Sequence, residues 1–229
     1  DDPDIIDMQE VLHHQLEVLK TGLPEYTVVG VGREDGKTAG EYAPIFFKQA
    51  KYTLLDQNTF WLCEKPDSVG MVGWDAALTR IATWVKLQDK KTGQILMVVN
   101  THFDHIGTEA RRNSALLIIE KIKEIVGTSP AILTGDFNVS EDWDAYKTIT
   151  NNEFILKDAH KVAGKRTGVD FTYHNFGKIP AEKCEKIDFI FVTPQIRVIS
   201  SYIPFSQLND TLFLSDHNPE IVELEIEKS

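Results

Sequence analysis

The chain has 229 residues, 42% of them hydrophobic and 26% charged, a composition that excludes a disordered or low-complexity protein. Thirty-five acidic against 24 basic residues give a net charge of -11, which disfavours a long polyanion such as nucleic acid as the default ligand. The length suits a single domain over residues 1–229. No stretch approaches the roughly 18 apolar residues of a membrane span. We therefore expect a soluble chain, either cytoplasmic or exported after loss of an N-terminal segment.

The first half of the chain predicts short strands and one helix. A strand at 4–8 leads to Glu10, which is expected at the start of a helix whose apolar face carries Leu16 and Leu19. Alternating apolar residues at 81–87, a turn-prone segment and a second run at 95–99 indicate a hairpin. The second strand of this hairpin ends at Asn100-Thr101-His102. Further strands are predicted at 26–31, 45–48 and 52–55.

The second half of the chain predicts a long helix between strands. Thr108 is expected to cap this helix, whose apolar stripe packs in the core. A strand at 131–134 runs into Asp136 and Asn138, and Ser140 is expected to cap a short helix after it. Many strands with few helices suggest two packed sheets flanked by helices. The remaining strands are predicted at 187–192, 198–203 and 221–226, and His160 and His174 are expected in a polar loop.

Polar residues recur at the ends of these predicted strands, where a sheet gathers its loops on one rim. In a strand, positions two apart point to the same face, so Asn100 and His102 share a face, as do Asp136 and Asn138. We expect one rim to hold these side chains together. Glu10, Asp188, Asp216 and His217 complete the set.

These residue types fit phosphoester chemistry with a hard cation. Carboxylate and amide oxygens suit Mg²⁺, with Mn²⁺ as the alternative, and the candidate metal ligands are Glu10, Asp136, Asn138 and Asp216. A phosphoryl group also needs hydrogen-bond donors, for which the candidates are Asn138, His102 and Arg80. For Arg80, a surface ion pair is the alternative interpretation. Proton transfer is assigned to His217, tuned by Asp188 or Asp216.

The motifs Gln9-Glu10, Asn100-Thr101-His102, Gly135-Asp136-Phe137-Asn138, Lys186-Ile187-Asp188-Phe189 and Ser215-Asp216-His217 occur in this order. The chain thereby resembles the endonuclease/exonuclease/phosphatase superfamily, over nearly its whole length. The resemblance implies a four-layer α/β/β/α sandwich of the DNase-like type. It also implies catalytic roles for His217, Asp136, Asp188 and His102.

Two longer strings narrow the kinship. Gly40 to Phe46 and Gly73 to Arg80 resemble a bacterial branch distantly similar to the carbon-catabolite-repressor type deadenylases. Members of the superfamily begin with a strand that carries a metal-binding Asn, followed by a helix, whereas this sequence starts at Asp1-Asp2-Pro3-Asp4. We therefore expect a domain that lacks its first strand and is N-terminally incomplete, rather than an inactive relative.

The prediction is a Mg²⁺-dependent phosphoesterase that hydrolyses a phosphomonoester or phosphodiester, either a small molecule or a short nucleic acid, by water attack. One alternative is a metallo-β-lactamase-like zinc hydrolase, because the segment from Asn100 to His105 is one histidine short of a His-x-His-x-Asp-His motif and His160 offers a later ligand. The other alternative is a binding module that holds a phosphorylated ligand without cleaving it.

Overall fold

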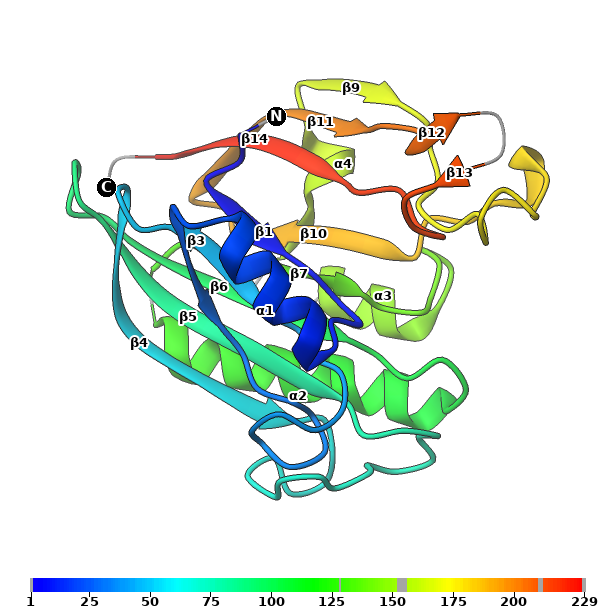
Figure 1. The fold of residues 1–229 in the computed structure, drawn as a ribbon, viewed down its shortest axis with the longest axis horizontal. Coiled ribbons are helices and arrows are strands. Elements are labelled where there is room, and N and C mark those ends of the chain that lie inside the picture. Colours follow the sequence, from blue (N-terminus) through cyan, green and yellow to red (C-terminus); the bar gives the residue numbers. More distant parts are fainter. Residues whose placement is uncertain (1, 128, 152–155, 210–211, 228–229) are drawn as a thin grey trace.

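The structure, a computed structural model, describes residues 2–127, 129–151, 156–209 and 212–227. Two layers of β-sheet pack against each other, and helices cover the outer face of the larger layer and part of the outer face of the smaller one (Figure 1). This arrangement confirms the predicted α/β class with two packed sheets. Across the described residues, none of the helices is long and apolar enough to cross a membrane.

The larger layer is a six-stranded sheet in the order β4-β5-β6-β7-β10-β8. Its strands are antiparallel except for β6 and β7, which run parallel and are joined by the long helix α2. This crossover brings the C-terminal ends of β6 and β7 to the same end of the sheet. The strands are β4 (Tyr52–Trp61), β5 (Ile81–Asp89), β6 (Ile95–His102), β7 (Ala131–Asp136), β8 (Lys157–Asp158) and β10 (Asp188–Val192).

The second layer consists of two three-stranded sheets, in the orders β1-β3-β2 and β14-β11-β9. Among the described residues, β1 and β14 each pair with one neighbouring strand. A separate hairpin of β12 and β13 precedes the loop that carries His217. The strands are β1 (Ile5–Asp7), β2 (Tyr26–Val29), β3 (Ile45–Lys48), β9 (Lys165–Gly168), β11 (Ile196–Ile203), β12 (Gln207–Asn209), β13 (Leu212–Phe213) and β14 (Ile221–Ile226).

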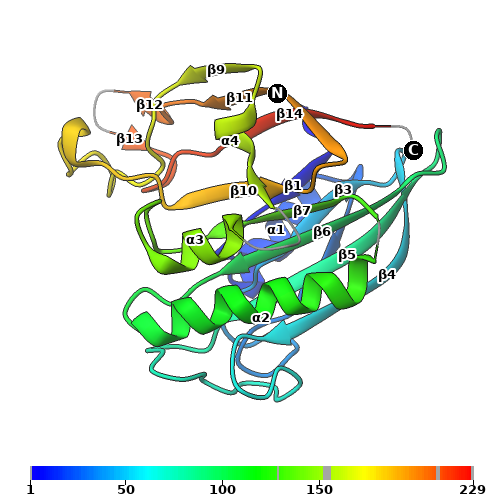
Figure 2. The same ribbon diagram turned by 180° about the vertical axis from the view of Figure 1, so that it is seen from behind.

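The three longer helices lie outside the two sheet layers. Helices α2 (Thr108–Val126) and α3 (Asp144–Thr150) cover the outer face of the six-stranded sheet and lie toward the viewer in Figure 2. Helix α1 (His13–Gly22) packs on the sheet of β1, β2 and β3 from the opposite side. The short elements are α4 (Ala159–Val162) and a 3-10 turn, η1 (Ala181–Lys183).

The apolar alternation of the strands explains the layering. In β6, Met97 and Val99 face the helices, whereas Leu96 and Val98 face the second sheet layer. One strand therefore contributes to both cores, since successive side chains point to opposite faces. The near-continuous burial of β5, β6 and β7 follows from this double coverage.

Both predicted helix caps are wrong. Helix α2 begins at Thr108 itself, and its first amides donate to the side chain of Asp75, from a distant loop. Helix α3 begins only at Asp144, because Ser140 lies in a preceding turn where its carbonyl accepts from Trp143 N. Side chains far away in sequence provide interactions that local patterns cannot reveal.

The prediction of a polar loop is wrong for His160, which lies in a short helix, whereas His174 lies in an irregular segment as expected; both side chains are buried. His160 lies in α4, and its Nδ1 is 2.8 Å from Ser201 Oγ. His174 packs against Phe205 and Phe213. Neither histidine is a solvated loop residue.

Candidate active site

Three candidate residues lie side by side on adjacent strands. In the register of the six-stranded sheet, His102 of β6 is paired with Asp136 of β7, and Asp136 is paired with Asp188 of β10. Directly opposed residues project to the same face. The alignment also needs Gly135, because a Cβ there would lie 2.3 Å from the carbonyl oxygen of Thr101. The glycine of the Gly135-Asp136 motif thus permits close approach of β6 and β7.

A loop from the second sheet layer adds His217 to this row. Its Nδ1 lies 2.8 Å from Asp188 Oδ2, and its Nε2 lies 3.9 Å from Asp136 Oδ2. The ring also packs against Tyr173 at a centroid distance of 5.0 Å. Asp188 is itself fixed through its backbone amide, which donates to Thr172 Oγ1. The imidazole is therefore oriented from one side and faces Asp136 on the other.

Burial and neighbouring charges shift the proton affinities of this group. Burial disfavours the charged imidazolium, but the hydrogen bond to Asp188 and the surrounding carboxylates outweigh it and raise the pKa of His217 to about 9. For Asp136, burial and then the charge of Asp188 raise the pKa to about 8. Without a cation, the site thus retains protons at neutral pH. Such strongly perturbed pairs are common at catalytic sites.

His102 and Asn138, at or just beyond the C-terminal ends of the neighbouring strands β6 and β7, form a second contact. Asn138 Nδ2 lies 3.0 Å from the carbonyl oxygen of Phe103 and 3.2 Å from His102 Nε2, so both amide hydrogens have acceptors and Oδ1 is left for a ligand. Burial, followed by the charges of Arg80 and Arg33, holds the pKa of His102 well below its usual value. The His102 ring is therefore neutral at pH 7. Its proposed contact with phosphate stays a prediction.

Asn138 and Glu10 both adopt left-handed backbone conformations, with φ of 50° and 60°. Such conformations are unfavourable for residues other than glycine and concentrate at functional sites. Glu10 precedes α1 instead of starting it, and its Oε1 lies 3.9 Å from His102 Nε2. Asp216 is close enough to raise the pKa of Glu10, after the larger effect of burial. Glu10, Asn138 and Asp216 therefore lie around the same rim.

Arg80 is a buried residue and not part of a surface ion pair. Its Nε lies 3.4 Å from Asp104 Oδ1, and its Nη2 lies 3.0 Å from His105 Nδ1. The Arg80 side chain borders the same pocket as His102. Its role in binding phosphate stays a prediction.

Two groups of side chains among the described residues have the composition and spacing to hold a metal ion. One contains Asp136, Asp188 and His217, and the other contains Glu10, Glu41 and His102. Glu41 was missed as a candidate, because it lies in the irregular segment before β3, where no strand alternation marks it. The predicted metal ligands Glu10 and Asp136 thus belong to different groups.

The zinc alternative is wrong. Both oxygens of Asp104 are taken by backbone amides and by Arg80, and Asn100 Nδ2 donates to two backbone carbonyls. His160 is hydrogen-bonded to Ser201 and does not join His102 in either metal group of the described residues. The chain therefore lacks an assembled His-rich zinc centre in the part that the structure describes.

The sandwich of two sheet layers, with carboxylates and histidines gathered at one end of the larger sheet, defines a domain of the DNase-like fold class. The model of the Endonuclease/Exonuclease/phosphatase family matches residues 1–217, and the chain belongs to this family. The members of this family are phosphoester hydrolases and typically use divalent metal ions. The superfamily prediction is thereby confirmed.

Solved structures agree with this assignment. An endonuclease/exonuclease/phosphatase from Bacteroides vulgatus is 65% identical, with a TM-score of 0.95, and the match covers 98% of this chain and 85% of that one. A mannosyl-6-phosphatase from Bacteroides thetaiotaomicron is 38% identical, with a TM-score of 0.91, over 97% of this chain and 85% of that one. The catalytic domain of human Nocturnin, at 18% identity and a TM-score of 0.77, over 98% of this chain and 81% of that one, shares the fold.

Proposed function

We propose that the chain is a Mg²⁺-dependent phosphoesterase that cleaves a small phosphomonoester by water attack. The observation that carries this proposal is the contact of His217 with Asp188 through Nδ1, while its Nε2 faces Asp136. A base oriented by a carboxylate beside a second buried carboxylate is an arrangement for moving a proton to or from a reacting oxygen.

The donor set fits a hard divalent cation. The raised pKa of Asp136 reflects its burial and the charge of Asp188, which the charge of His217 only partly offsets, and a cation would offset it further. We assign Mg²⁺, with Mn²⁺ as the alternative, to Glu10, Asp136, Asn138 and Asp216, whose oxygens suit such ions. Glu10 and Asp136 belong to two different groups, but these groups are neighbours, since His102 Nε2 lies 3.9 Å from Glu10 Oε1 and 3.6 Å from Asp136 Oδ2. When bound, the ion would neutralise charge that develops on the phosphoryl oxygens.

The chain's own residues then have distinct tasks. His217 holds or moves a proton at Nε2, since its Nδ1 is engaged by Asp188. Asp136 orients the attacking water, and Asn138 presents Oδ1 at the rim. Because Nε2 of the neutral His102 ring accepts from Asn138 Nδ2, the ring would donate to the phosphate through its Nδ1–H, without adding charge.

Substrate class follows from charge and kinship. A net charge of -11 disfavours long polyanions, so a small phosphoester is the better candidate. The similar protein from Bacteroides thetaiotaomicron is a mannosyl-6-phosphatase, which supports a sugar phosphate monoester as the first substrate to test.

The test is a panel of phosphoesters offered to chelator-treated protein with Mg²⁺, Mn²⁺ or Zn²⁺. The panel contains hexose 6-phosphates, nucleoside monophosphates, bis-p-nitrophenyl phosphate and short DNA and RNA. We expect release of inorganic phosphate from a monoester with Mg²⁺ or Mn²⁺. His217→Ala and Asp136→Ala should each reduce kcat by about 10²- to 10⁴-fold.

His14→Ala is the matched control, because His14 is exposed on α1 and should leave turnover unchanged. Near-normal turnover in His217→Ala or Asp136→Ala would contradict the proposed roles. Tight binding of a phosphoester without cleavage, in folded wild-type protein with Mg²⁺, would instead support a binding module.

A further inference from the structure

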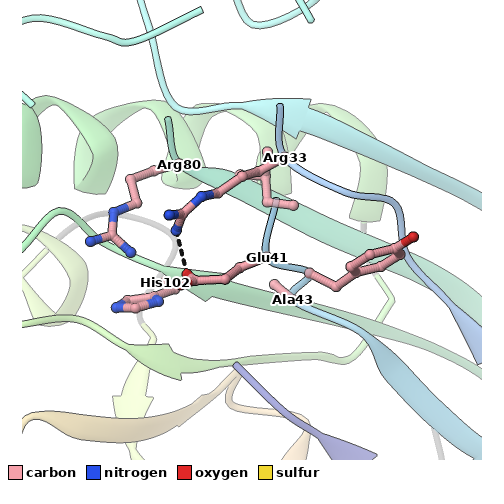
Figure 3. A pocket seen from close by; sticks show the side chains of 7 residues that line it. Arg33, Glu41, Ala43, Arg80 and His102 are labelled. Carbon is pink, nitrogen blue, oxygen red and sulfur yellow. Dashed lines mark hydrogen bonds and ion pairs between the residues drawn. The ribbon is translucent and has the colours of Figure 1, made fainter. Parts of the chain in front are cut away.

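A pocket beside His102 has no role in the chemistry proposed above. Its cavity volume is about 10 Å³, close to the minimum that holds one water molecule, so it takes only a single small group such as a hydroxyl. Figure 3 shows the guanidinium groups of Arg33 and Arg80 above the His102 ring, with Glu41 between Arg33 and His102. The complete lining is Arg33, Glu41, Tyr42, Ala43, Arg80, Ile81 and His102.

Arg80, which lines this pocket, has a buried hydrogen-bond donor that is not used. The residue is only 4% exposed, and its Nη1 is buried without a partner among the described residues. Its counter-charge, Asp104, also accepts hydrogen bonds from the backbone amides of Ala77, Ile106 and Gly107. A buried donor without a partner is unfavourable, so an oxygen acceptor in the pocket would stabilise the arrangement.

Arg33 and Glu41 give the pocket both a hydrogen-bond donor and an acceptor, with opposite charges. Arg33 Nη1 lies 2.5 Å from Glu41 Oε2, and this ion pair is mostly buried. The pair is held in place because Arg33 O accepts from Trp61 Nε1 and Arg33 N donates to Glu41 O. The pocket therefore contains fixed donors on the two arginines and a carboxylate acceptor.

This mixture favours neutral hydroxyl groups over a second anion. A hydroxyl both accepts and donates, so it can receive a hydrogen bond from Arg80 Nη1 and donate one to Glu41. An anionic group could use the arginines but would face the carboxylates of Glu41 and Glu10, whose negative charges repel it. The pocket's position next to His102 places it beside the candidate phosphate site.

We propose that this pocket binds hydroxyl groups on the alcohol part of the phosphoester, so that the substrate is the phosphate ester of a small polyhydroxylated compound such as a sugar. Arg80 and Arg33 donate to hydroxyl oxygens, and Glu41 accepts from a hydroxyl hydrogen. The inference rests on the proposed phosphoesterase function and specifies its substrate class.

The test compares a hexose 6-phosphate with its singly deoxygenated analogues, in wild type and in Arg33→Met. In wild type, loss of the recognised hydroxyl should lower kcat/KM by about 10- to 100-fold, mainly through KM. In Arg33→Met that penalty should shrink to about 3-fold or less, since the variant has already lost the hydrogen bond between Arg33 and the substrate hydroxyl. Arg197→Met, an exposed arginine of β11, is the matched control and should keep the wild-type penalty.

Failure of the pocket assignment and failure of the proposed phosphoesterase function give different results. An equal penalty for deoxygenation in wild type and Arg33→Met, or none in wild type, overturns the pocket assignment while turnover still supports a phosphoesterase. If wild type cleaves none of these esters, the proposed function fails. Calorimetric binding of the same esters then decides the pocket: a hydroxyl-dependent affinity that Arg33→Met removes supports it, and its absence overturns it.

A second variant guards against misfolding. Glu41→Gln keeps the side-chain shape and an acceptor oxygen but removes the charge. Because the hydrogen bond to the hydroxyl is then weaker, the deoxygenation penalty should be smaller than in wild type, as it should be in Arg33→Met. Both variants should unfold cooperatively near the wild-type midpoint. If Arg33→Met is unfolded, the result with folded Glu41→Gln decides, and an unchanged penalty there overturns the proposal.

Discussion

His217 Nδ1 lies 2.8 Å from Asp188 Oδ2, and this contact links the loop after β13 to the first residue of β10. The carboxylate fixes the orientation of the ring and favours its protonated form. The contact therefore makes the proton affinity of His217 depend on a residue in a different sheet layer.

Asp188→Asn should lower the pKa of His217 from about 9, because the hydrogen bond and the negative charge that raise it are both weakened. Turnover should fall by about 10²- to 10⁴-fold. The pKa is measured by NMR titration of metal-free protein, and kcat by steady-state kinetics with Mg²⁺. Asp56→Asn, an exposed change on β4, is the control. An unchanged pKa in Asp188→Asn would remove the proposed coupling.

The metal-free protein should become less stable as the pH rises from about 7 to 9, above the range in which the buried His102, His160 and His174, with their lowered pKa values, would stabilise it with rising pH. Burial raises the pKa of Asp7 to about 7 and, together with Asp188, that of Asp136 to about 8. His217 is raised to about 9. Each of these raised folded-state pKa values exceeds its unfolded value, so each contribution is complete below the unfolded pKa and is lost as the pH passes the folded one.

Urea unfolding in chelator at pH 7, 8 and 9 measures this trend. Asp136→Asn should flatten it, because the amide does not titrate. The pKa of Asp104 is lowered to about 2 by backbone amides and Arg80, which outweigh its burial, so its contribution is lost only as the pH falls toward 2 and leaves this window unaffected. A stability that stays constant or rises from pH 7 to 9 would contradict the assignment.

Mg²⁺ should stabilise the protein more at pH 8 than at pH 5.5. At the lower pH a proton occupies Asp136 and competes with the cation, whereas near its pKa of about 8 the carboxylate is increasingly available. At 100 times the dissociation constant the unfolding midpoint should rise by about 5 to 10 °C. Differential scanning calorimetry measures the shift, and Asp136→Asn should abolish its pH dependence.

Much of the candidate site could be predicted from sequence, because its residues stand at strand ends. His102, Asp136 and Asp188 follow apolar alternation, and the register of three strands then aligns them. Alternation alone places each residue on a face of its strand. It does not supply the 2.8 Å contact with His217, which depends on how a loop from the other layer returns.

Residues in irregular segments could not be predicted. Arg33 and Glu41 lie between β2 and β3, where no period marks them, and their pairing depends on backbone bonds within that loop. The neutral state of His102 is equally hidden, because its low pKa arises from burial by both layers and from arginines distant in the chain. Packing between segments that are distant in the chain determines this ion pair and this pKa, and the local sequence does not reveal that packing.

A buried ion pair between Lys186 and Glu220 contacts the backbone of Asp188, the first residue of β10. Lys186 Nζ lies 2.7 Å from Glu220 Oε2, the two side chains are 7% and 3% exposed, and the same ammonium donates to Asp188 O. Lys186→Met should cost about 3 to 5 kcal/mol, since it leaves a buried carboxylate unpaired. Lys186→Met combined with Glu220→Leu should cost less than the two single changes summed. Urea unfolding measures all three variants, and strict additivity would show that the pair is not coupled.

The N-terminus of α2 offers the clearest contrast between local pattern and structure. Asp75 Oδ1 lies 2.7 Å from Ala110 N and its Oδ2 lies 3.3 Å from Glu109 N, so this carboxylate takes the place of the expected Thr108 cap. Asp75→Ala should destabilise the protein by about 1 kcal/mol, whereas Thr108→Ala, at an exposed site, should stay within about 0.5 kcal/mol. Urea unfolding of both variants decides between the two caps. A larger loss in Thr108→Ala would mean that the helix is capped locally, and the contact from Asp75 would then contribute little to holding α2 on the sheet.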